Sequence, residues 1–139
     1  MTIRFIGSVD RELVEEISDR LADQALTGFD FELGDIGTFK RGRLVRVAWL
    51  GLRSGADAAA ALAAQVEAEC RRAGLDPESR AFQAHATLAR ARDRDGSDLP
   101  PLPAPPQLGP WRATQLILYS SRLTKSGAVY ETLWTLPLR

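Results

Sequence analysis

The sequence predicts an α+β fold with a mainly antiparallel sheet. Two segments carry apolar residues at helical spacing, six short segments have the alternating or continuous apolar character of strands, and the last two strand segments flank a tight turn. At 139 residues and 15.2 kDa, the chain is long enough for one domain with a core and too short for two. We therefore expect residues 1–139 to form a single domain.

The first strand is predicted at residues 2–6 (Thr-Ile-Arg-Phe-Ile), where polar and apolar residues alternate almost from the start of the chain. A helix is predicted after it, with Ser8 as the N-cap. Leu13, Ile17 and Leu21 recur at helical spacing, so this helix is expected to be amphipathic.

Two strands are predicted next. Apolar and acidic residues alternate over 29–33, which indicates a strand followed by a loop at Gly34 and Gly37. Residues 44–50 (Leu-Val-Arg-Val-Ala-Trp-Leu) are almost continuously apolar and are closed by Gly51. Such a run is typical of an interior strand.

The second helix is predicted to begin after Ser54, its candidate N-cap, and to end at Gly74. Its segment is rich in alanine, which has the highest helix propensity. Leu62, Val66 and Cys70 mark its buried stripe. Cys70 is the single cysteine, so it cannot form an internal disulfide and is expected to be a small core residue.

Three more strands are predicted in the second half of the chain. One covers residues 82–88, and two others, 113–121 and 128–136, form a hairpin around the turn 125–127. Six of the eight prolines fall between Pro100 and Pro110, so this segment is expected to be a surface loop. A ligand for a polyproline-binding partner is the less favoured alternative.

Composition excludes several classes of protein. The formal net charge is zero, which excludes a highly basic protein that coats nucleic acid. The charge is unevenly distributed, however: residues 1–39 carry a net charge of −6 and residues 40–139 a net charge of +6, so the second part could face a polyanion. We find no apolar run long enough to span a membrane and no signal peptide, and we expect a cytoplasmic protein. The chain contains one histidine, so these residues supply one imidazole.

That histidine, His85, is the main candidate for chemistry, because phosphate-binding glycine loops, zinc spacings and a nucleophile elbow are absent from the sequence. On a strand, His85 and Thr87 share one face, while Ala84, Ala86 and Leu88 are predicted to point into the core. Arginines flank this strand, which suits an anionic ligand. From these residues alone, a solvated strand histidine is the more common interpretation.

Residues 82–90 (Phe-Gln-Ala-His-Ala-Thr-Leu-Ala-Arg) resemble the second signature of the 2H phosphoesterase superfamily. They are most similar to the LigT branch, the RNA 2′,3′-cyclic phosphodiesterases that are also called 2′-5′ RNA ligases. Three more regions of the chain resemble this branch in the same order: residues 2–7 (Thr-Ile-Arg-Phe-Ile-Gly), 47–51 (Val-Ala-Trp-Leu-Gly), and 118–121 together with 127–131. The resemblance therefore covers nearly the whole chain.

The resemblance implies a bilobal α+β fold in which each half contributes one His-x-Thr strand to a central cleft. It implies that His85 is the general base, that Thr87 and the first-motif threonine, Thr2, bind the phosphate, and that Arg90 and Arg4 add positive charge. Arg4 is equally compatible with a solvated strand arginine. The chemistry requires no metal and no cofactor is implied, because two imidazoles can move both protons. The reverse reaction would join a cyclic phosphate end to a 5′-hydroxyl.

The resemblance also leads to an expectation about the start of the chain. If Thr2 is the first-motif threonine, the first histidine stands immediately before Met1, together with an opening strand and helix of roughly 25 to 40 residues. We expect the natural start to lie upstream, with a His-Met-Thr triplet in the reading frame. The 139-residue chain is then expected to lack its general acid, to be catalytically impaired and to be marginally stable.

Several other residues have an ordinary interpretation that is favoured. A basic cluster formed by Lys40, Arg41, Arg43 and Arg46 could guide RNA, but such a run is more often a solvated loop. Three tryptophans could stack on bases, but core packing is favoured for each of them: Trp49, Trp111 and Trp134. On the final hairpin, either Tyr119 or Tyr130 could line the cleft.

The leading functional hypothesis is an RNA 2′,3′-cyclic phosphodiesterase that opens the cyclic phosphate at an RNA end to a 2′-phosphate. The expected partner is RNA or an oligonucleotide with such an end, and the protein is expected to be a monomer without membrane contact. Two alternatives remain. The substrate could be a small cyclic nucleotide, such as a cyclic phosphate of ADP-ribose. The chain could instead be a non-catalytic module that binds RNA ends through Thr2, His85 and Thr87.

Overall fold

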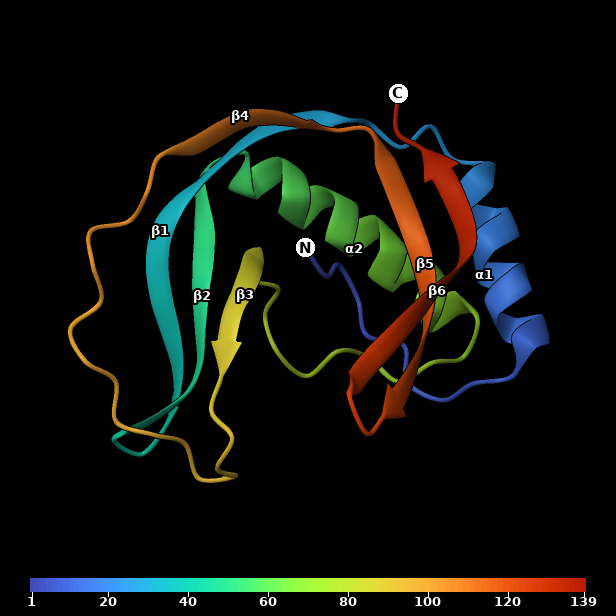
Figure 1. Ribbon diagram of the computed structural model, residues 1–139. Helices are drawn as coiled ribbons and strands as arrows, with labels where there is room; N and C mark the ends of the chain where they lie inside the picture. Colours follow the sequence, from blue (N-terminus) through green and yellow to red (C-terminus); the bar gives the residue numbers. More distant parts are fainter.

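Two antiparallel sheets and two helices form the structure, a computed structural model that describes residues 1–139 (Figure 1). The bounds of the elements are α1 Arg11–Ala22, β1 Phe29–Arg41, β2 Leu44–Ser54, α2 Ala56–Arg72, β3 His85–Arg90, β4 Leu108–Ala113, β5 Gln115–Thr124 and β6 Gly127–Pro137. The predicted α+β class with antiparallel sheets is therefore confirmed.

The larger sheet has the strand order β3-β2-β1-β4, and β5 and β6 pair separately as a long hairpin. Figure 1 shows that β1 and β4 curve over the top of the molecule, and that α2 runs between the four-stranded sheet and the β5–β6 hairpin. Helix α1 packs on the far side, beside β6. Neither helix has both the length and the apolar character needed to cross a bilayer.

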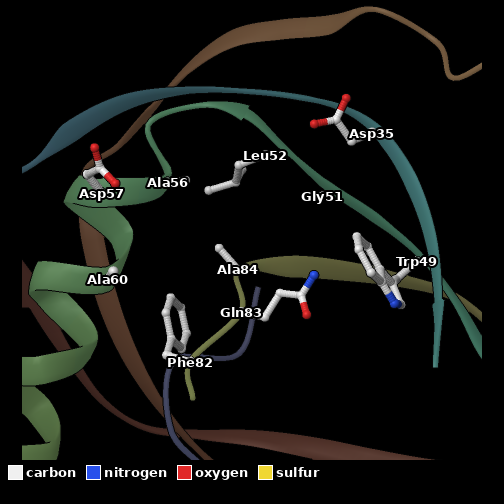
Figure 2. Close-up of a pocket in the computed structure, with 10 residues that line it drawn as sticks. All are labelled: Asp35, Trp49, Gly51, Leu52, Ala56, Asp57, Ala60, Phe82, Gln83 and Ala84. Atoms are coloured by element: carbon white, nitrogen blue, oxygen red, sulfur yellow. The ribbon is translucent and has the colours of Figure 1, made fainter.

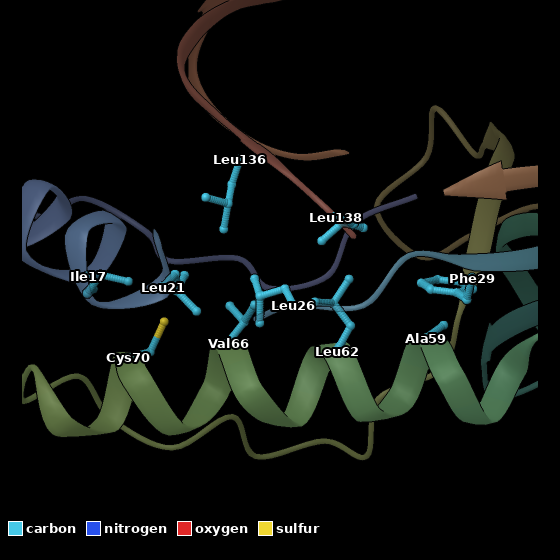
Figure 3. Close-up of a cluster of buried hydrophobic side chains, with 10 residues drawn as sticks. All are labelled: Ile17, Leu21, Leu26, Phe29, Ala59, Leu62, Val66, Cys70, Leu136 and Leu138. Atoms are coloured by element: carbon cyan, nitrogen blue, oxygen red, sulfur yellow. The ribbon is translucent and has the colours of Figure 1, made fainter. Parts of the chain in front are cut away.

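The core forms where one stripe of α2 meets α1, the start of β1 and the end of β6 (Figure 3). As predicted, Leu62, Val66 and Cys70 lie on the buried stripe of α2. Cys70 is completely buried, and this burial raises the pKa of its thiol against the opposing effect of the nearby Arg4 guanidinium. The predicted role of Cys70 as a small core residue is confirmed.

The last residues of the chain tie three segments together. The Arg139 N–H donates to the Leu26 carbonyl over 2.9 Å, and the Gly28 N–H donates to the Arg139 carbonyl over 2.7 Å. The Leu138 N–H donates to the Thr114 carbonyl over 2.8 Å. Because Leu138 is also buried in the core, the end of β6 joins the entrance to β1 and the link between β4 and β5.

The strand predicted at residues 2–6 is absent. No backbone N–H or C=O of these residues bonds to another backbone group, because no strand lies beside them. The segment is held instead by its side chains: Ile3 and Ile6 pack against the core, whereas Phe5 is 73% exposed.

Both predicted helix caps are displaced. Asp10, not Ser8, precedes α1, and Gly55, not Ser54, precedes α2. Gly55 has a left-handed φ of 82°, and a Cβ at this position would lie 2.4 Å from the Asp30 carbonyl oxygen. Glycine is therefore required where the chain turns from β2 into α2.

The predicted loop at Gly34 and Gly37 is in fact part of β1. Glycines there leave room for large side chains that lie on the sheet, Arg53 over Gly34 and Trp49 over Gly37. Strand β4 was not predicted, because its sequence contains Pro110. A proline is tolerated there because β4 is an edge strand, where a missing N–H need not cost a ladder bond.

Truncation of a buried leucine to alanine should destabilise the fold much more than truncation of an exposed one. Leu62→Ala should lower the free energy of unfolding by about 2–5 kcal/mol, because Leu62 is only 5% exposed and its loss leaves a cavity. Leu123→Ala is the matched control, and since Leu123 is 87% exposed it should change stability by less than about 0.5 kcal/mol. Urea unfolding followed by circular dichroism measures both, and equal effects would contradict this packing.

Candidate active site

His85 is the first residue of β3 and lies opposite Gly51 of β2. Its Nδ1 is 2.7 Å from the carbonyl oxygen of Gln83. Because a carbonyl oxygen only accepts, Nδ1 must carry the proton in this contact. In the neutral ring Nε2 is then unprotonated, and its lone pair is available to accept a proton.

Two aromatic rings hold the imidazole in place. Phe39 of β1 meets it edge-on, with the ring centroids 5.1 Å apart and the planes at 88°. Trp49 of β2 lies 6.0 Å from the imidazole and 5.4 Å from Phe39. Trp49 can lie over the sheet because a Cβ on Gly37 or Gly51 would fall 2.1 Å or 2.9 Å from its indole ring.

A cavity of about 360 Å³ opens beside this aromatic group, between β2 and the first turns of α2. Figure 2 shows Leu52 near its centre, Phe82 and Gln83 below it and Trp49 at one side. His85 does not itself line the cavity, but it follows the lining residues Gln83 and Ala84 directly, and its ring centroid lies 6.0 Å from that of Trp49, which does line it. The volume is in the range of small-ligand pockets.

A β-bulge decides which residues of β3 share a face with His85. In the register between β2 and β3, Gly51 pairs with His85, Trp49 with Thr87 and Val47 with Arg90. The register shifts between Ala48 and Trp49, so Leu88 of β3 has no partner on β2 and is the extra residue of the bulge. Directly paired residues lie on the same face, so His85, Thr87 and Arg90 share one face. Simple alternation would have put Arg90 on the opposite face.

The same bulge explains an incorrect prediction. Leu88 was expected to point into the core, but it is 57% exposed. It stands at the bulge of an edge strand, where no element of the fold covers it. Ala84 and Ala86 are half-buried, and Ala84 packs against the core.

Three of the five predicted site residues share one face of β3, with Thr87 near His85 and Arg90 at the other end of the strand, and two lie elsewhere. His85, Thr87 and Arg90 share the face of β3, whereas no hydrogen bond, ion pair or ring contact links Thr2 or Arg4 to His85. Thr2 is exposed in the N-terminal segment.

Arg4 is engaged elsewhere. Its guanidinium lies 2.9 Å from a Glu67 carboxylate oxygen, 2.8 Å from one of Glu78 and 2.7 Å from the Asp76 carbonyl oxygen. These contacts fasten the N-terminal segment to α2 and to the loop that follows it. The predicted contact of Arg4 with phosphate stays a prediction, because a phosphate would have to compete with two carboxylates.

No aromatic ring besides Phe39 and Trp49 contacts the imidazole. Core packing is confirmed for Trp134, which packs against the core, but it is wrong for Trp111, which is 45% exposed and packs on Phe31. Tyr119 and Tyr130 contact each other on the exposed hairpin.

Two contributions to the site were not predicted from the sequence. They are the ring of Phe39 and the backbone carbonyl of Gln83. Counting back from the turn at Gly42 would pair Phe39 with Arg46, but a register shift between Phe39 and Lys40 pairs it with Val47, two residues from Trp49. The hairpin register was therefore not an available signal for Phe39. Nothing in the sequence indicated the role of the Gln83 carbonyl.

Known proteins resemble this chain in both sequence and fold. Residues 50–130 match the family model described as LigT-like phosphoesterase. The RNA 2′,3′-cyclic phosphodiesterase of Aeropyrum pernix is 33% identical over 140 residues, which cover 96% of this chain and 78% of the relative. The protein of the same name from Escherichia coli is 29% identical over 138 residues, which cover 98% of this chain and 74% of the relative.

Solved structures show the same fold. The crystal structure of E. coli LigT complexed with 3′-AMP superposes with a TM-score of 0.83 at 28% identity, covering 99% of this chain and 75% of that one. A crystal structure of a Thermus thermophilus protein superposes with a TM-score of 0.81 at 25% identity, covering 99% and 76%. Sequence and fold thus place the chain among the phosphoesterases. It belongs to the LigT-like phosphoesterase family, and the resemblance stated from the sequence is confirmed.

The contact with Gln83 predicts the tautomer of His85. For the neutral ring, long-range ¹H–¹⁵N correlation spectra should show a protonated Nδ1 and an unprotonated Nε2. The chain has one histidine, so the signals require no assignment by mutation. A spectrum with the proton on Nε2 would contradict the arrangement described here.

Proposed function

We propose that this chain acts as an RNA 2′,3′-cyclic phosphodiesterase and opens a terminal cyclic phosphate to a 2′-phosphate by acid–base catalysis. The observation that carries the proposal is the environment of His85. The Gln83 carbonyl orients the ring so that Nε2 is the free base, beside a cavity and on the same face as a hydroxyl and a guanidinium. Support also comes from the relatives that bear this name.

The reaction assigns a role to each of these groups. Nε2 of His85 takes a proton from water as the water oxygen forms a bond to phosphorus. The bond between phosphorus and the ribose 3′-oxygen breaks, and that oxygen must receive a proton. The Thr87 hydroxyl, two residues from His85 on the same face, stabilises the negative charge that builds on the nonbridging oxygens. Arg90 stands at the other end of β3, about 17 Å from His85 at the usual rise per residue, so its guanidinium adds positive charge to this face without contacting those oxygens.

The proton for the leaving oxygen comes from a general acid. Family resemblance assigns this role to the histidine of the first motif, next to the position of Thr2, and the 139-residue sequence contains no histidine besides His85. We therefore propose that these residues supply the base and the phosphate-binding groups. Without an imidazole acid, the rate is expected to be lower by about 10²- to 10⁴-fold.

A small cyclic nucleotide is the second candidate substrate, and the cavity beside His85 favours it because its volume suits a single nucleotide. Values of kcat/KM for a cyclic-phosphate octanucleotide and for a cyclic mononucleotide separate the two candidates. Binding of a cyclic-phosphate end without turnover would instead support the non-catalytic module.

Two substitutions test the proposed roles. His85→Ala should lower the rate of 2′-phosphate formation by about 10²- to 10⁴-fold, because the base is lost. Thr87→Val should lower kcat by about 10²-fold by removing a hydrogen-bond donor to the charged oxygens, whereas the control Thr87→Ser keeps the hydroxyl and should stay within a few-fold of the parent.

The measurement is ³¹P NMR of the phosphate formed from the cyclic phosphate, because a 2′-phosphate and a 3′-phosphate have equal mass but different chemical shifts. If His85→Ala formed the 2′-phosphate at the same rate as the parent, another group would have to accept the proton. A 3′-phosphate product would contradict the proposed cleavage of the bond between phosphorus and the ribose 3′-oxygen.

A further inference from the structure

The chain between β3 and β4 contains an extended segment at the surface. Figure 1 shows the chain leaving the end of β3 and running around the outer side of β1 before β4 begins. Residues 98–107 belong to no helix or strand, and every one of them is exposed. The predicted surface loop is therefore confirmed over these residues, whereas Leu108, Gly109 and Pro110 belong to β4.

Proline fixes the shape of this segment. Each of the eight residues 99–106 is a proline or directly precedes one. Proline holds φ near about −65°, and the residue before a proline is kept out of the helical region, so the whole stretch is restricted to polyproline II and β conformations. The segment is therefore extended before it meets any partner.

Both ends of the segment are fixed to the larger sheet. Ser97 forms an antiparallel bridge with Val45 of β2, through N–H to carbonyl hydrogen bonds of 2.9 and 3.0 Å. Asp95 pairs at 3.1 Å with Arg41, which was expected in a solvated loop but is the last residue of β1. At the other end, β4 begins and pairs with β1. Between these anchors, residues 98–107 take part in no hydrogen bond or ion pair and do not pack against the core.

Two leucine–proline pairs lie side by side on this segment. A polyproline II helix has three residues per turn, so Leu99 and Leu102 share one edge, and Pro100 and Pro103 share the next. Both leucines are 40% exposed. A spacer between β3 and β4 needs prolines for stiffness, but it gains nothing from apolar side chains in water. The leucines therefore indicate a binding surface.

We propose that residues 99–103 (Leu-Pro-Pro-Leu-Pro) are a docking site for a protein domain whose aromatic-lined groove binds polyproline II helices. Each leucine–proline pair fills one pocket between the aromatic rings of the groove. Because the segment is already extended and is anchored at both ends, binding orders little additional chain. This interaction is separate from the chemistry at His85.

The charge beside residues 99–103 defines the partner further. Asp98 directly precedes Leu99 and forms no ion pair, and residues 98–107 contain no cation. A groove with an acidic rim would repel Asp98. The partner therefore has a neutral or basic rim.

Two domains of this kind test the docking site. A ¹⁵N-labelled WW domain with a basic rim and a ¹⁵N-labelled SH3 domain with an acidic rim are each titrated with the 139-residue protein. The indole N–H of the groove tryptophan is followed by NMR. The WW domain should show a saturable shift, and the SH3 domain should bind at least about 10-fold more weakly.

Matched variants locate the contact. Leu102→Ala/Pro103→Ala should weaken binding of the WW domain by at least about 10-fold, because one pair no longer fills its pocket. The control Pro105→Ala/Pro106→Ala changes two residues of the same segment outside 99–103 and should bind as the parent does. Both variants should melt at the parent's temperature, because these residues make no contact with the core.

The absence of a shift in the WW domain, or equal affinities for the parent and Leu102→Ala/Pro103→Ala, would overturn the docking site and leave the segment as a spacer. Binding of a synthetic 98–107 peptide but not of the protein would also overturn it, because the anchored segment would then be inaccessible. Tighter binding of the SH3 domain than of the WW domain would overturn the assigned rim. None of these measurements uses turnover, so they hold whether or not the proposed function does.

Discussion

The site depends on the position of one indole ring. Trp49 lies across β1 and β2 because both Gly37 and Gly51 lack a side chain at the point of contact. From there the ring packs against Phe39 and His85 and forms one side of the cavity. A methyl group on either glycine would force the indole away, so two residues without side chains determine where the imidazole stands.

The imidazole is directed by a backbone group, and this has a chemical advantage. A carbonyl oxygen fixes the tautomer as a carboxylate would, yet it adds no full negative charge beside an anionic substrate. The nearest cation on the same face of the strand, Arg90, stands at the far end of β3, where the bulge at Leu88 turns it to that face. One irregularity in the edge strand therefore decides on which face of the sheet this positive charge lies.

Much of the fold could be predicted from the sequence because it follows from periodicity. The stripe of α2, the apolar run of β2 and the final hairpin depend on local patterns that tertiary packing only confirmed. That His85 and Thr87 lie on the same face of their strand was predictable for the same reason, since alternate residues of a strand share a face.

The incorrect predictions concern features that depend on neighbours. Residues 2–6 have the pattern of a strand but no adjacent strand to bond to, and β1 continues through two glycines because side chains of β2 occupy their space. Strand β4 contains a proline that only an edge can accept. The shared face of Arg90 depends on a bulge, which no pattern of residue types indicated.

The hydrogen bonds made by Leu138 and Arg139 have a consequence for synthesis on the ribosome. They join the entrance to β1 with the link between β4 and β5, and these segments leave the exit tunnel long before residues 138 and 139 do. Contacts between residues far apart in sequence form only when the intervening chain closes into a loop, so they form late. Leu136 and Leu138 are the last residues of the core cluster along the chain, so the core beside α2 can be completed only after both have left the tunnel.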